Sequence, residues 1–77
     1  MTVSPRESLW TLVKGGHVEA ALMFQGELGI EVEFLNEGVM AYTHCWPLRV
    51  QAVQEANWQR QQLMREGWTA PETVDAA

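Results

Sequence analysis

Three side chains in this sequence could carry nucleophilic catalysis, namely Cys45, His44 and His17. His44 and Cys45 are neighbours in a segment that alternates like a β-strand, so we expect their side chains to point to opposite faces and not to act as a pair. A reactive thiolate also needs a nearby positive charge, and residues 15–48 contain no Lys or Arg. We therefore expect no catalytic residue in this chain and no enzymatic activity of its own. A site shared with another chain, to which His44 or Cys45 contributes, stays an alternative.

Metal and cofactor sites have no better support in the sequence. The two histidines and single cysteine lack the paired spacing of structural zinc sites. Glu31 and Glu33 share one face of a strand, as a general acid and a general base might. A solvated sheet face produces the same spacing routinely, so the pair does not indicate catalysis. The pair Gly15-Gly16 lacks the strand-to-helix context of a phosphate-binding loop. We expect no metal, no cofactor and no small-molecule substrate.

Length and charge narrow the class of protein. The chain has 77 residues, 8.7 kDa and a net charge of −5, which predicts one small domain with a thin core. One cysteine cannot form an internal disulfide, and the first six residues do not resemble a signal peptide. The longest apolar run, 20–24, is far too short to span a bilayer. We expect a cytoplasmic protein without a membrane partner.

Turn residues divide the first half of the chain into strand-length pieces. Gly15-Gly16 is a two-residue hairpin signal, and 25–27 and 36–38 are further turns. The first piece, 9–14, is predicted as a strand, although Ser4, Pro5 and Glu7 leave a short helix over 5–14 as an alternative.

The apolar alternation predicts which strand faces are covered. A three-residue loop at 25–27 would place Phe24 opposite Leu28 and Leu22 opposite Ile30, so that both apolar rows share the covered face. The strand over 39–46 has two possible registers. A two-residue turn would direct Ala41, Thr43 and Cys45 to the core, and a three-residue bulged turn would direct the even-numbered residues 40–46 there. We favour the bulged turn because it buries more apolar area.

A helix follows the strands. Pro47 is predicted to begin it and Gly67 to end it, and its apolar stripe consists of Leu48, Ala52, Val53, Ala56, Leu63 and Met64. The predicted fold is therefore α+β, a four-stranded antiparallel β-meander of two hairpins with one C-terminal helix packed across one face. The domain is expected to span 1–68, with the Trp68 ring packed on it and 69–77 as a flexible, acidic tail.

One helix covers only one face of a four-stranded sheet. The strand alternation assigns the apolar residues Trp10, Leu12, Ala21, Met23 and Leu35 to the uncovered face. Monomers seldom expose a large contiguous apolar patch, so we expect this face to bind a protein partner or a second copy. The residues predicted to do so are Trp10, Leu12, Met23 and Leu35.

The helix carries a second candidate surface. Trp58 is expected on its outer side among glutamines and Arg65, the composition of an aromatic anchor with a polar rim. We therefore predict a small interaction protein that self-associates or binds a protein partner. The alternative is a nucleic-acid-associated regulator that uses the arginine side of the helix, but the five glutamates of residues 15–48 disfavour nucleic acid.

Overall fold

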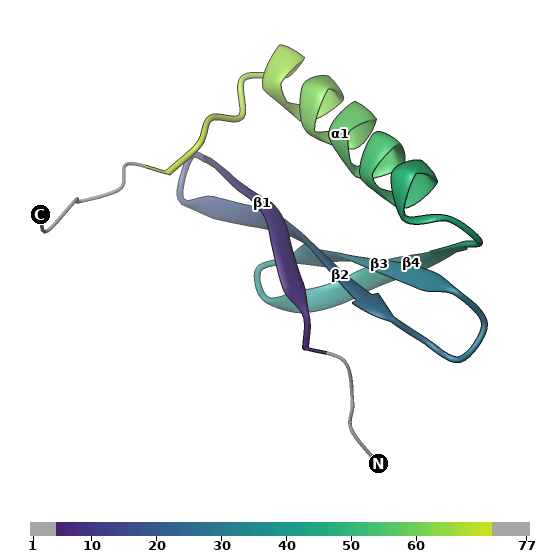
Figure 1. Ribbon diagram of the computed structural model, residues 1–77. Coiled ribbons are helices and arrows are strands. Elements are labelled where there is room, and N and C mark those ends of the chain that lie inside the picture. Colours follow the sequence, from purple (N-terminus) through teal and green to yellow (C-terminus); the bar gives the residue numbers. More distant parts are fainter. Residues whose placement is uncertain (1–4, 72–77) are drawn as a thin grey trace, which may run out of the picture.

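The computed structural model describes residues 5–71 and has one sheet and one helix (Figure 1). Its elements are β1 (Glu7–Lys14), β2 (His17–Gln25), β3 (Ile30–Asn36), β4 (Val39–Trp46) and α1 (Arg49–Arg65). The strands pair antiparallel in the order β1-β2-β3-β4, and α1 lies across one face of the sheet. The predicted α+β meander with a C-terminal helix is confirmed. Within 5–14, residues 7–14 form the strand β1, and the alternative of a short helix is wrong.

Two of the hairpins close with two-residue turns whose central residues have positive φ. Gly15 and Gly16 have φ of 56° and 83°, and Glu37 and Gly38 have φ of 55° and 79°. Such turns match the twist of the flanking strands, which is why glycine is preferred in them. Glu37 is the one position here without glycine, and its Oε1 accepts a 2.8 Å hydrogen bond from the Val18 N–H. The carboxylate thereby ties the β3–β4 turn to the start of β2.

The β2–β3 connection differs from the prediction of a three-residue loop. Gln25 pairs with Ile30, so the loop contains four residues, 26–29. The Gly26 N–H donates to the Gly29 carbonyl at 2.8 Å, and Leu28 is 91% exposed within the loop rather than opposite Phe24. Because side chains alternate along a strand, this change in register exchanges the two faces of β2. Ala21 and Met23, not Leu22 and Phe24, therefore face α1.

The β4 register combines features of both alternatives. Asn36 pairs with Val39, so the turn has two residues and the preferred three-residue turn is wrong. The register then shifts, because Leu35 pairs with Met40 and Phe34 with Tyr42, leaving Ala41 as an extra residue. This bulge turns Tyr42, His44 and Trp46 toward the α1 side, as the preferred register predicted. Met40 lies on the opposite face, where that register was wrong.

The core lies between α1 and the sheet. Its buried side chains are Trp10, Leu12, Ala21, Met23, Val32, Phe34, Ala52 and Ala56. α1 supplies only the two alanines, whose small size lets the helix backbone approach the sheet. Leu63 packs against this core, but Leu48, Val53 and Met64 are exposed, contrary to the predicted stripe. The reason is that the sheet contacts only a narrow strip of the helix.

The C-terminal end of α1 has the geometry expected of a glycine cap. Gly67 has φ of 100°, and the Trp68 N–H donates to the Leu63 carbonyl at 3.1 Å, closing the last turn. The Trp68 ring packs against the core as predicted. Thr69, which was expected in the tail, pairs with Val13 at the outer edge of β1. Residues 72–77 of the predicted tail lie outside the described residues.

Candidate functional site

The face of the sheet opposite α1 is not covered by another described helix or strand, and we call it the open face. Its apolar side chains are Val13, Val18, Ala20, Leu22, Phe24, Leu35 and Met40. Val18 and Met40 are 37% and 54% exposed, and the other five are half-buried among their neighbours. The sequence correctly predicted that an apolar face would be left over, but it assigned mostly different residues to that face.

Three predicted partner-binding residues are wrongly placed. Trp10, Leu12 and Met23 are 8%, 0% and 2% exposed and form the centre of the core beneath α1. The cause is the register of the β2–β3 hairpin, which places Met23 opposite Val32 on the helix side. Leu35 does lie on the open face, opposite Ala20.

Sequence reasoning missed Leu22 and Phe24, the largest side chains that β2 contributes to the open face. The signal that could have found them is Gly29. It has φ of 146°, and a Cβ at this position would lie 2.6 Å from the Trp46 carbonyl oxygen. Gly26 and Gly29 thus bracket a four-residue loop, and its length sets the register of both flanking strands.

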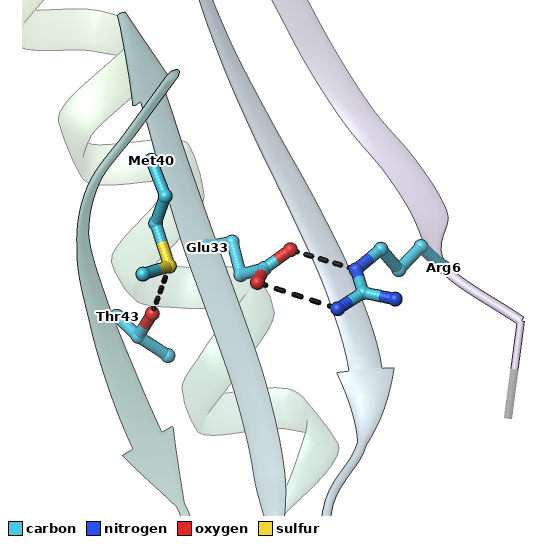
Figure 2. Close-up of polar contacts among 4 residues, drawn as sticks. All are labelled: Arg6, Glu33, Met40 and Thr43. Atoms are coloured by element: carbon cyan, nitrogen blue, oxygen red, sulfur yellow. Dashed lines mark hydrogen bonds and ion pairs between the residues drawn. The ribbon is translucent and has the colours of Figure 1, made fainter. Parts of the chain in front are cut away.

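An arginine crosses the open face (Figure 2). Arg6, just before β1, reaches over β2 to Glu33 on β3, and its Nε and Nη2 donate to the carboxylate at 2.8 and 3.5 Å. The guanidinium also lies 4.5 Å from the centroid of the Phe24 ring, a cation–π distance. The hydrogen bond from Arg6 to Glu33 raises the pKa of the guanidinium above its usual range. Glu33 is therefore neutralised on this face, and Phe24 is partly covered.

The side of the open face near β4 is acidic and partly polar. A shallow hollow of about 270 Å³ is lined by Glu27, Leu28, Glu31 and Cys45. Beside it, the Thr43 hydroxyl donates to the Met40 sulfur at 3.0 Å (Figure 2). Two carboxylates and no cation line the hollow, so it lacks the positive charge that would activate the Cys45 thiol.

The candidate catalytic side chains do not assemble. His44 pairs with Val32 on the helix side and Cys45 with Glu31 on the open face, as their adjacency predicted. The His44 Nδ1 lies 3.7 Å from Glu55 on α1, while His17 contacts Glu37 at the hairpin turns. Within residues 5–71, no three His, Cys, Asp or Glu side chains gather closely enough to bind a metal ion.

The outer side of α1 carries the other two predicted contact residues, Trp58 and Arg65. Trp58 is 54% exposed and Arg65 is exposed at the last turn. Glu55, one turn before Trp58, contacts His44 of β4, so Trp58 lies on the flank of the helix nearer β4. At the other end of α1, Arg49 forms a 2.8 Å ion pair with Glu7 of β1.

Comparison with protein families, with characterised proteins and with solved structures found no match to this chain. The described residues contain no helix with the length and apolar character that a bilayer span requires.

Proposed function

We propose that this chain is a non-enzymatic interaction protein that binds another protein through the open face. The observation that carries this proposal is the apolar surface of β2 and β3 that α1 leaves uncovered. Leu22 and Leu35 contribute large, half-buried side chains to it, and the Phe24 ring beside them is partly covered by Arg6. A contiguous apolar patch on a small domain is typical of a surface that binds a partner.

The charges around this surface indicate which kind of partner surface would fit it. Glu27 and Glu31 rim the β4 side, and Arg6 neutralises only Glu33. The complementary surface would be apolar at its centre and basic at the rim that meets Glu27 and Glu31, since opposite potentials favour encounter and register. Trp58 offers a second and separate surface on α1, on the opposite side of the sheet from the open face, where an exposed indole is a frequent energetic anchor.

A nucleic-acid partner is the weaker hypothesis. It relies on the helix arginines, and Arg49 is already engaged by Glu7 at 2.8 Å. Arg65 is exposed at the other end of α1 and Arg60 is half-buried, so the three helix arginines do not form a continuous track for phosphates.

Position-specific crosslinking tests the main proposal. A photoreactive benzoylphenylalanine is placed at Leu22, or at the exposed control position Val50, in cells that express the chain. We expect a discrete protein adduct from the Leu22 position that disappears when Leu35→Lys is added. The matched control Gln61→Lys, on the outside of α1, should leave it intact. A folded chain without an adduct at Leu22, or with the same adducts at Val50, would contradict the proposal.

A further inference from the structure

The two edges of the sheet are protected to very different degrees. An edge strand presents unpaired backbone groups that can pair with another strand, and proteins usually block it with charges, proline, bulges or covering segments. At the β1 edge, Thr69 forms two backbone hydrogen bonds with Val13, of 2.8 and 3.0 Å. Charged Glu7 and Lys14 terminate the strand, and its register shifts between Ser8 and Trp10. This edge is well blocked.

The β4 edge has only one such device. Its eight residues contain no Lys, Arg, Asp, Glu or Pro, and no other segment of residues 5–71 pairs with its outer side. The bulge at Ala41 interrupts the register, but Tyr42–Trp46 then runs without a shift to the end of the strand. This segment, rich in aromatic and β-branched residues, has the composition of a strand that pairs well.

We propose that the outer edge of β4 pairs antiparallel with β4 of a second copy, joining the two sheets into one of eight strands. Strand addition at a free edge is an established mode of recognition. An antiparallel pair of identical strands has two-fold symmetry and closes as a dimer. Because β4 contains no Lys, Arg, Asp or Glu, the two paired strands bring no such like charges together. If the two-fold axis passes beside His44, residues 42–46 of one copy pair along their whole length with residues 42–46 of the other. Thr43 then lies opposite Cys45 of the second copy.

The places where the described residues 5–71 begin and end favour a second copy over an intramolecular cover. The described N-terminal end at Pro5 leads directly into β1, and Thr69 near the C-terminal end pairs with β1. Both ends therefore lie at the edge opposite β4, as Figure 1 shows for the course of the chain.

The proposed dimer also accounts for the exposed Trp58 side chain. This step rests on the proposed function, because it names a second copy of the chain as the partner that contacts Trp58. A two-fold axis perpendicular to the sheet puts both α1 helices on one side of the continuous sheet. Each helix then presents its β4 flank to the other. Glu55 contacts His44 of β4, and Trp58 follows Glu55 by three residues, so helix spacing places the two side chains next to each other. The exposed indole would be covered on dimerisation, while the open face stays available for another protein.

Sedimentation equilibrium of the full chain at micromolar concentration tests this dimer. We expect twice the monomer mass of 8.7 kDa. Thr43→Lys at the β4 edge should restore the monomer with an unchanged circular dichroism spectrum, because the two lysines would lie diagonally across the axis on one face of the joined sheet. Thr11→Lys on β1 is the matched control and should remain dimeric. A monomeric wild-type chain overturns the proposal, as does a dimer that survives Thr43→Lys but is dissociated by Leu22→Lys on the open face.

A disulfide provides a test that does not depend on a dissociating variant. Thr43→Cys should form an intermolecular disulfide with the native Cys45 under mild oxidation, since directly opposed residues have the required Cβ separation. The same substitution combined with Cys45→Ser should not. Absence of the crosslinked species from an oxidised, folded Thr43→Cys protein overturns the pairing. The Leu22 photo-adduct is read independently, so failure of the β4 dimer and failure of the open-face proposal are distinguishable.

Discussion

The indole Nε1 of Trp10 donates a 2.8 Å hydrogen bond to the backbone carbonyl of Ala56. This bond links β1, at one edge of the sheet, to the middle of α1, and both residues are buried. The Ala56 side chain is small enough for the ring to reach the helix backbone. A buried N–H without a partner is costly, so this contact fixes where α1 crosses β1 as well as adding contact area.

Replacing Trp10 tests that bond. Trp10→Phe keeps an aromatic ring but removes the N–H and leaves space beside Ala56. We expect the free energy of unfolding to fall by at least about 1 kcal/mol, the usual value of one hydrogen bond. Urea denaturation measures it. The control Trp58→Phe, at an exposed site, should stay within about 0.5 kcal/mol of the wild type. Equal losses for both variants would contradict a special role for the Trp10 bond.

The close approach of α1 to the sheet depends on alanine at position 52. Ala52 is 0% exposed, so Ala52→Leu must push the helix outward or force strained rotamers. We expect the variant to lose about 1–3 kcal/mol of stability, the typical cost of overpacking a core. Thermal and urea unfolding check it. Val50→Leu, on the exposed side of the same helix, should change stability little, and a comparable loss there would argue against the packing explanation.

Glu19 should make stability depend on pH. It lies on the α1 side of β2, and burial, followed by the negative charge of Glu37, raises the pKa of its carboxyl above the usual value. The folded state therefore binds the proton more tightly than the unfolded state does. This group's contribution is present at low pH and is lost as pH rises through the folded-state pKa.

Glu19→Gln removes the penalty for the charged carboxylate. We expect it to raise the free energy of unfolding at about pH 7 and to have little effect at about pH 4, near the ordinary pKa of a glutamate. Urea denaturation at both pH values measures the difference. Glu27→Gln, in the exposed 26–29 loop, is the control. A gain that is independent of pH would refute the electrostatic explanation.

The four-residue β2–β3 loop should depend on Gly29. Gly29→Ala places a Cβ 2.6 Å from the Trp46 carbonyl oxygen, at a φ of 146° that other residues rarely adopt. We expect a loss of about 1–3 kcal/mol, measured by denaturant unfolding. Gly26→Ala in the same loop is the control because its Cβ would meet only the Glu31 side chain, which can rotate away. A larger loss at Gly26 would show that this account of the loop is wrong.

Much of the fold could be predicted because its signals are local. The Gly15-Gly16 turn, the alternation of β2 and β3, and the glycine that ends α1 each depend on residues a few positions apart. The prediction that one apolar sheet face would remain uncovered was also possible, because a single helix covers only one face of a four-stranded sheet. The exposed position of Trp58 followed in the same way, from its angle on the helix.

The identity of the open face could not be predicted in this way, because it depends on single-residue differences in connection length. One additional residue in the 26–29 loop moves Leu22 and Phe24 away from α1 and turns Met23 toward it. In β4, the extra residue Ala41 reverses the effect of the shorter turn and returns Tyr42 to the helix side. Each difference changes the local sequence pattern little, but each moves the side chains that follow it to the other face of the sheet.

The sequence by itself determined four strands, one helix and an acidic sheet, since turn chemistry and periodicity act over short ranges. Only the tertiary structure decided that Trp10, Leu12 and Met23 form the core and that Leu22, Phe24 and Leu35 form the open face. The physical reason is that both faces of β2 are apolar, so burial alone does not choose between them. The choice was made by the loop that fits Gly29 against Trp46, and by the helix whose alanines fit over Trp10.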